Sequence, residues 1–171
     1  GHPKIFRHAG AVFGLRVPLQ EYADDSDTTR LRAAVVDAET KREILCIDPA
    51  GDTVLSAPRC RVSREAGDAA FQYLEAAINL AKCSSVDAIV TAPLNKEALH
   101  LAGHDFPGHT EILADRCGIV EFAMMLHLPE SAMKEWRHLI RPILRATTIS
   151  GFATVLNGLS IAHVTLHTSV A

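Results

Sequence analysis

A long amphipathic helix followed at once by a β-branched run is the feature that most constrains the fold. Between residues 64 and 82, Phe71, Leu74 and Ile78 recur at three- and four-residue steps and share one helical face. The run 86–91, Val-Asp-Ala-Ile-Val-Thr, has the length and composition of a strand. A helix joined to a short strand in this way is typical of an α/β fold.

Shorter elements are predicted from caps and stops. Asn95 is placed to cap a helix over 95–102, Thr110 to cap one over 110–116, and Ser63 to cap the long helix. The other predicted elements are a helix within 5–17 that ends near Gly14, a strand over 43–48, and two buried strands over 122–128 and 160–166.

Composition excludes several classes of protein. The 171 residues are 48% hydrophobic, which is enough for the core of about one domain and too apolar for a disordered chain. The net charge of −3 argues against a nucleic-acid partner. Polar residues interrupt the uncharged stretch 146–171, so we expect no membrane span. The four scattered cysteines and the lack of a signal-peptide pattern predict a cytoplasmic protein without disulfides.

The stretch from Thr91, where the predicted strand ends, to Glu111 is the strongest candidate for a binding site. Ligands gather at the carboxyl ends of strands in open α/β sheets, and the free N–H groups at helix starts attract anions. His109 and Thr110 stand at such a start, and Lys96 could add a positive charge. The alternative is an ordinary Gly-His turn with Thr110 as a helix cap and Glu111 in the first turn.

Two histidines in the last predicted strand, His163 and His167, are spaced to face the same way. His167 falls at the carboxyl end, where a metal ligand could lie, but a divalent ion needs about three protein ligands. His163 is a candidate core residue.

The segment 129–157 between the last two strands reads as an insertion that contains a helix. Trp136 lies on its apolar face, and three arginines recur at four-residue steps on the other side: Arg137, Arg141 and Arg145. This basic stripe could hold a phosphate or an acidic partner, although such stripes are more often solvated surfaces.

Several ordered blocks resemble the 4-hydroxythreonine-4-phosphate dehydrogenase family. They include the Thr-Ala-Pro-Leu-Asn-Lys sequence of residues 91–96 and the Gly-His-Thr-Glu sequence of residues 108–111. The complete set of similar blocks is 86–99, Ala102-Gly103, Phe106, 108–114, 123–126 and 162–167.

The resemblance implies a three-layer α/β/α fold like that of isocitrate and isopropylmalate dehydrogenases, here incomplete. It implies NAD- or NADP-dependent oxidation, with decarboxylation, of a small phosphorylated hydroxy acid such as 4-phosphohydroxy-L-threonine. A divalent metal (Zn, Mg or Co) would assist, and the full-length form would be a homodimer. By resemblance, His109 and Thr110 bind substrate and His167 is one of three metal ligands, while catalytic and cofactor-binding residues stay unassigned.

The chain also departs from the family pattern. We expect residues 1–171 to be an internal portion of a two-domain dehydrogenase, because further metal histidines and most of the nucleotide site would lie elsewhere. One alternative is an inactive fragment or interaction module. Others are a relative that acts on threonate or erythronate 4-phosphate or on a ring dihydrodiol, and a metal-dependent hydrolase or aldolase on the same scaffold.

Overall fold

The computed structural model describes residues 1–23, 27–129, 131 and 158–163 of the chain. These residues belong to two compact units, 1–120 and 121–171. The predicted helix of the 129–157 insertion, with Trp136 and the arginine stripe, lies outside the described residues, and so does His167.

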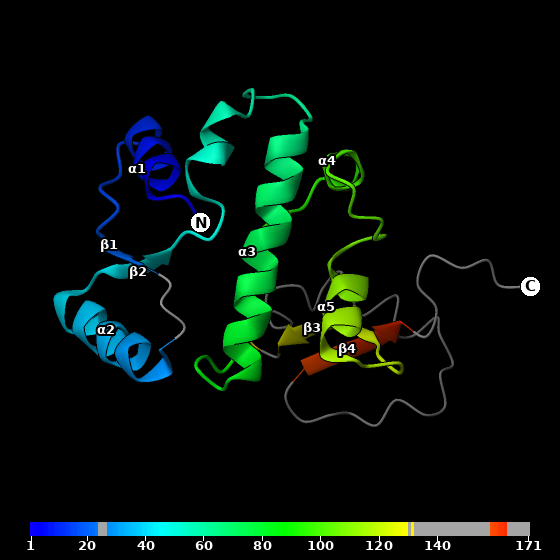
Figure 1. Cartoon of the computed structure of the whole chain (residues 1–171). Helices are drawn as coiled ribbons and strands as arrows, with labels where there is room; N and C mark the ends of the chain where they lie inside the picture. Colours follow the sequence, from blue (N-terminus) through cyan, green and yellow to red (C-terminus); the bar gives the residue numbers. More distant parts are fainter. Residues whose placement is uncertain (24–26, 130, 132–157, 164–171) are drawn as a thin grey trace, which may run out of the picture. The chain divides into compact units, whose positions relative to one another are not determined.

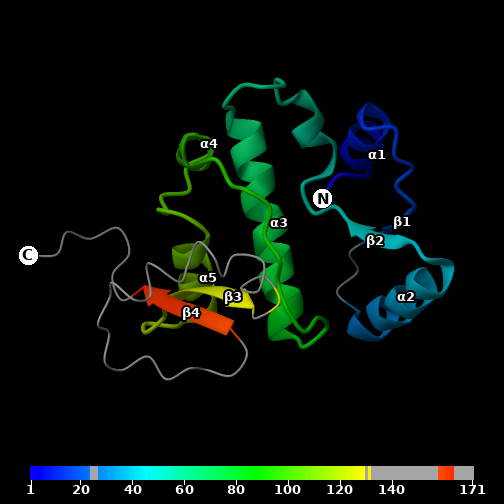
Figure 2. The same cartoon turned by 180° about the vertical axis from the view of Figure 1, so that it is seen from behind.

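The first unit is built around one long helix, α3, which stands between two groups of shorter elements (Figures 1 and 2). Helices α4 and α5 lie on one side of it, and α1, α2 and two strands lie on the other. In chain order the elements are α1 (Pro3–Val12), β1 (Leu19–Tyr22), α2 (Thr28–Lys41), β2 (Ile44–Ile47), the short 3-10 helix η1 (Gly51–Ser56), α3 (Arg64–Lys82), α4 (Lys96–Leu101) and α5 (His109–Cys117).

Helix α3 confirms the prediction from apolar spacing. Its start is capped as expected, since the Ser63 side chain accepts a hydrogen bond from the Ala66 amide. Its predicted face, Phe71, Leu74 and Ile78, is buried. The same cluster contains two fully buried side chains, Leu99 of α4 and Ile112 of α5, so one hydrophobic core holds the three helices together.

The helix ends agree with the stop signals in the sequence. Gly14, Gly103 and Gly118 adopt positive φ angles of 66°, 93° and 67°, and each follows a helix within two residues. A residue with a side chain is strained in this conformation, which explains why glycine stands at these ends. Helix α1 begins at Pro3, with His2 as its cap, before the predicted segment.

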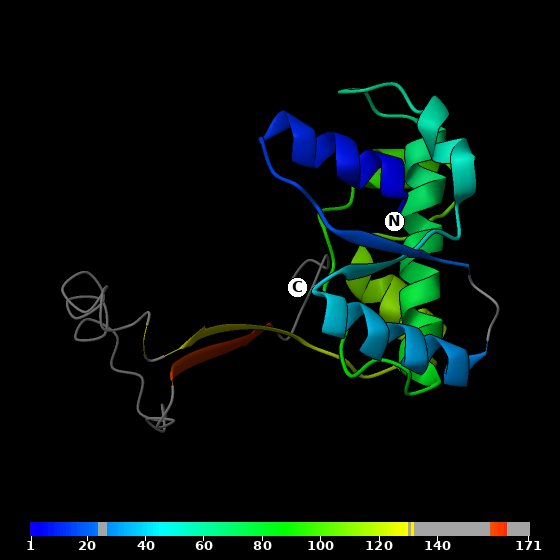
Figure 3. The ribbon, with the colours of Figure 1, turned by 90° about the vertical axis from the view of Figure 1, so that its left-hand side faces the viewer.

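A β-α-β unit precedes α3. Strands β1 and β2 are parallel, with Leu19 opposite Ile44 and Tyr22 opposite Ile47, and α2 makes the crossover between them. Figure 3 shows the two strands side by side. Strand β2 confirms the prediction over 43–48, whereas β1 and α2 were not predicted.

The predicted strand over 86–91 is wrong. Within the described residues this segment pairs with no strand, and the side chain of Val90 is 96% exposed. A strand needs a hydrogen-bonded neighbour as well as β-branched composition, and the described elements offer none to this segment.

The second unit contains an antiparallel pair, β3 (Met124–Pro129) and β4 (Gly158–His163). Met124 lies opposite His163 and Pro129 opposite Gly158. Both strands fall on predicted segments, although 164–166 lie outside the described residues. The prediction that the first of them is buried is wrong within the described residues, because Met125 and Leu126 are exposed.

The fold therefore mixes helices and strands, as an α/β reading requires, in one parallel and one antiparallel two-stranded sheet. The three-layer arrangement stays a prediction. All four cysteines are free, as expected. Among the described helices, none is long and apolar enough to cross a membrane.

Candidate functional site

The predicted substrate-binding pair opens helix α5. His109 is its first residue, and Gly108, in extended conformation, is its N-cap. Thr110 is therefore inside the first turn, and the prediction that it caps the helix is wrong. Because glycine has no side chain to accept hydrogen bonds, the first amides of α5 receive no side-chain cap. Unpaired N–H groups at the start of a helix favour an anion.

Two charged side chains approach Gly108 from different helices. A Cβ at position 108 would lie 3.8 Å from Cε of Lys96 in α4 and 3.5 Å from Oε2 of Glu111 in α5. The structure therefore brings Lys96 next to the Gly-His-Thr turn, as the sequence suggested. The Lys96 ammonium favours an anion here, whereas the Glu111 carboxylate opposes one.

His109 lines a cavity of about 260 Å³. The cavity also takes in Thr91, the last residue of the run 86–91, and Pro93 just after it, so the end of that run and His109 meet at one place. Thr110 and Lys96 are not among its lining residues. The other residues that line the cavity are mainly apolar: Gly1, Phe6, Ala70, Tyr73, Leu74, Ala77, Ile89, Val90, Ala92 and Leu94.

Tyr73 is a polar group of this cavity that the sequence reading missed. Within the described part of the chain, its buried hydroxyl oxygen has no hydrogen-bond partner, and neither does Oδ1 of Asp48. Burial, and then the negative charge of Asp48, raise the pKa of Tyr73 well above its usual range. Tyr73 therefore presents a neutral phenol. The sequence could have pointed to Tyr73 only through its position near the buried face of α3.

A second polar cluster surrounds His2, which is 4% exposed. Its Nε2 lies 3.0 Å from Oδ1 of Asp52 and 3.7 Å from Oδ2 of Asp48, and its Nδ1 accepts a hydrogen bond from the Lys4 amide. Hydrogen bonds from His2 and Lys4 lower the pKa of Asp52. His2 is thus a buried histidine whose two ring nitrogens both have partners.

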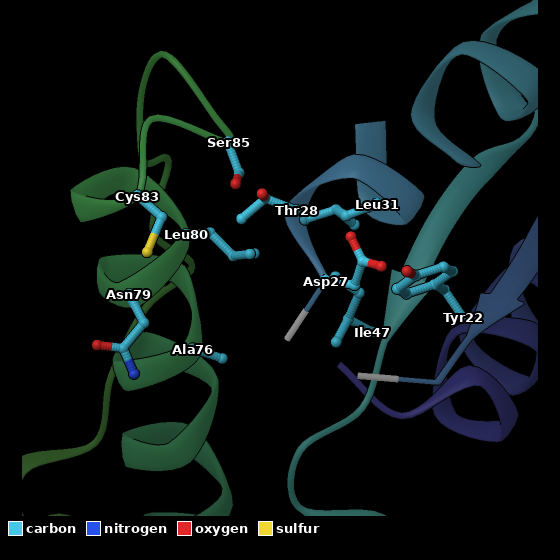
Figure 4. Close-up of a pocket in the computed structure, with 10 residues that line it drawn as sticks. All are labelled: Tyr22, Asp27, Thr28, Leu31, Ile47, Ala76, Asn79, Leu80, Cys83 and Ser85. Carbon is cyan, nitrogen blue, oxygen red and sulfur yellow. The ribbon is translucent and has the colours of Figure 1, made fainter. Parts of the chain in front are cut away.

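Another cavity, of about 190 Å³, lies between α3 and the β-α-β unit (Figure 4). Asn79 and Leu80 of α3, with Cys83 directly after the helix, stand opposite Thr28 and Leu31 of α2. No predicted site residue lines it. The Asp27 carboxylate at its edge caps α2 by accepting hydrogen bonds from the amides of Thr29 and Arg30.

The described residues do not provide a metal site of their own. No group of three or more His, Cys, Asp or Glu side chains among them is arranged to hold an ion. The predicted ligand His167 lies outside the described residues, and only the backbone of His163 is placed. The metal therefore stays a prediction that depends on His167.

Comparison with known proteins identifies a family for the whole chain and relatives for part of it. Residues 1–171 match the family described as pyridoxal phosphate biosynthetic protein PdxA. The chain is 56% identical over 73 residues to a D-threonate 4-phosphate dehydrogenase of Cupriavidus necator, which covers 43% of this chain and 22% of that one. It is 41% identical over 131 residues to the Bordetella bronchiseptica enzyme of the same name, which covers 74% of this chain and 37% of that one.

Solved structures agree with these relatives. A crystal structure of a 4-hydroxythreonine-4-phosphate dehydrogenase from Burkholderia phymatum superposes with a TM-score of 0.59 at 36% identity. The match covers 72% of this chain and 34% of that one. The chain thus spans between about a fifth and just over a third of the length of these relatives.

Proposed function

The chain belongs to the PdxA family of pyridoxal phosphate biosynthetic proteins, and from this premise we propose that it is part of a dehydrogenase that oxidises a four-carbon hydroxy acid 4-phosphate. D-threonate 4-phosphate is the first substrate to consider, because the relatives at 56% and 41% identity carry that name. 4-Phosphohydroxy-L-threonine is the second, since the Burkholderia phymatum protein is named for it.

The observation that carries this proposal is the uncapped start of α5, with His109 facing a cavity and Lys96 beside Gly108. A phosphate or carboxylate at this turn would accept hydrogen bonds from the His109 ring, from the Thr110 hydroxyl and from the first amides of the helix. Lys96 would screen the anion from the Glu111 carboxylate. These groups bind and orient the substrate.

The redox chemistry of such an enzyme would depend on bound groups. A bound NAD or NADP would supply the hydride acceptor, and a divalent metal would polarise the alcohol and the carbonyl that forms from it. We assign neither to the described residues. The remaining predicted properties, decarboxylation, a homodimer and cytoplasmic location, belong to this proposal as well.

The test is nicotinamide reduction by the purified protein with D-threonate 4-phosphate, with unphosphorylated D-threonate as the matched control. We expect the protein to turn over the phosphorylated acid but not D-threonate. The variant His109→Ala should lose about 10- to 100-fold in kcat/KM, because a hydrogen bond to a charged group is removed. Turnover that does not require nicotinamide would favour a hydrolase or aldolase. Equal activity of wild type and His109→Ala would remove His109 from the site.

The competing possibility is an inactive fragment or interaction module, and the partial coverage of the relatives is the observation that favours it. Calorimetric titration with D-threonate 4-phosphate separates the two. Heat that saturates in the wild type and disappears in His109→Ala supports a substrate site, whereas no heat of binding in either protein supports the module.

A further inference from the structure

We propose that His104 is a positioning residue for the substrate-binding turn, and that Asp68 and Phe71 of α3 hold it in place. The inference rests on the proposed role of His109 in substrate binding. It concerns the loop between α4 and α5, which runs from Ala102 to Gly108 and ends at that turn.

Two contacts of different kinds immobilise the His104 ring. Its Nε2 lies 3.0 Å from Oδ1 of Asp68. Its plane stacks on the ring of Phe71, with 3.7 Å between centroids and 12° between planes. Stacking sets the plane of the imidazole, and the hydrogen bond sets its rotation within that plane. Because Asp68 and Phe71 are three residues apart on α3, the long helix provides both contacts from one face.

The Asp68 carboxylate is itself anchored. It accepts a second hydrogen bond from the side chain of Gln72, 2.7 Å long and one turn along α3. The hydrogen bond from His104 is the largest cause of a lowered pKa of Asp68. The pair thus joins a charged acceptor on a rigid helix to a donor in the loop.

The loop then continues along the same face of α3. Phe106 packs on the core and lies 6.0 Å from the Phe71 ring, and the Arg116 guanidinium lies 5.3 Å from the centre of Phe71 and 5.8 Å from that of Phe106. Arg116 also donates from Nε to Glu75 of α3 over 2.8 Å. Two residues within the loop, His104 and Phe106, therefore contact α3 through the Phe71 ring.

The contacts of the loop with α3 determine the position of His109. Only Pro107 and Gly108 separate it from Phe106. Among the residues that the structure describes, none forms a hydrogen bond with the His109 ring, so its position depends on the backbone that carries it. A loop released from Asp68 and Phe71 would let this backbone move, and the substrate anion would lose the alignment that its binding requires.

Two variants of the full protein remove the hydrogen bond between His104 and Asp68 from either side. His104→Phe keeps a ring to stack on Phe71 and loses the hydrogen bond, and Asp68→Ala removes the acceptor. Asp68→Asn keeps an acceptor oxygen and is the conservative rescue. Asp37→Ala is the matched control, because it removes an exposed carboxylate that pairs with Lys41 on α2.

With D-threonate 4-phosphate and nicotinamide, we expect His104→Phe and Asp68→Ala to raise KM about tenfold while kcat stays within about twofold. Asp68→Asn and Asp37→Ala should keep the wild-type KM. A KM that stays unchanged in both His104→Phe and Asp68→Ala, or that rises equally in Asp37→Ala, would overturn the proposal.

A second measurement does not depend on turnover. The imidazole proton signal of His109 in NMR, assigned by its loss in His109→Gln, should shift in His104→Phe and in Asp68→Ala but not in Asp37→Ala. An unmoved signal in folded His104→Phe and Asp68→Ala proteins overturns the positioning role. If the wild type fails to turn over the substrate, the proposed function fails, and the NMR signal still decides the link between His104 and His109.

Discussion

Gly67 of α3 lies directly against the backbone of Ala98 in α4. A Cβ at position 67 would overlap the carbonyl group of Ala98 and would lie 2.9 Å from the amide nitrogen of Leu99. A backbone carbonyl inside a helix cannot rotate away as a flexible side chain can. This contact therefore sets how closely α4 approaches α3, and α4 carries Lys96 at its first position.

Replacing Gly67 with alanine should separate the two helices. We expect a loss of about 1–3 kcal/mol in the free energy of unfolding, as for other overpacked interiors, measured by urea unfolding. Hydrogen exchange of the α4 amides should accelerate as well. Gly118→Ala is the control, because it strains a left-handed residue in open space and leaves the α3–α4 contact intact. Unchanged α4 exchange in Gly67→Ala would contradict the close contact.

The helix caps give a second prediction. Asn95 accepts a hydrogen bond from the Ala98 amide over 2.8 Å, so Asn95→Ala should cost about 1 kcal/mol of stability. Thr110 caps nothing in the structure, and Thr110→Ala should stay within about 0.5 kcal/mol of the wild type. The same variant should weaken the binding of D-threonate 4-phosphate in calorimetry. Equal destabilisation by the two variants would show that Thr110 is a cap after all.

Tyr73 predicts a dependence of stability on alkaline pH. Its raised pKa keeps the phenol protonated in the folded protein when the unfolded chain begins to lose that proton, near about pH 10. The unfolded state then binds fewer protons, so the free energy of unfolding falls as the pH rises above that value. Tyr73→Phe lacks this contribution, and urea midpoints should fall less steeply for it between about pH 9 and 11. Parallel curves for the two proteins would contradict the assignment.

Asp68 leads to a prediction about stability at acid pH. Its pKa is lowered, first by the hydrogen bond from His104, so the stabilisation is present above the unfolded value of about 3.9 and disappears as the pH falls through the folded value. Because the side chain is 42% exposed, solvent screening keeps the effect small. In acid unfolding, Asp68→Asn should lose less stability than the wild type as the pH is lowered below about 4. A steeper acid loss for Asp68→Asn would argue against the pair.

Local signals in the sequence predicted the helices that carry the site. Ser63 and Asn95 cap α3 and α4 as expected, because a cap depends on neighbours three residues away. Helix α2 was not predicted because its apolar face is short: only Leu31 and Ala38 are buried, and Val35 and Val36 are exposed. The failed strand at 86–91 shows the limit of composition, because strand formation depends on a partner elsewhere in the chain.

The site itself was predictable in part. The pattern Gly-His-Thr-Glu singled out His109 and Thr110, and a helix does start at that turn. The pairs that surround it were not visible, because Asp68 and His104 lie 36 residues apart and each reads as an ordinary surface residue in its own segment. His167 stays a prediction, since it lies outside the described residues.

The most direct test of the account follows the His109 imidazole by NMR while D-threonate 4-phosphate is added to the protein. The account predicts a saturable shift of this signal with the phosphorylated acid and a much weaker response to unphosphorylated D-threonate, because the turn at α5 recognises the anion. Saturable binding of the phosphorylated acid that leaves the His109 signal unchanged would contradict it.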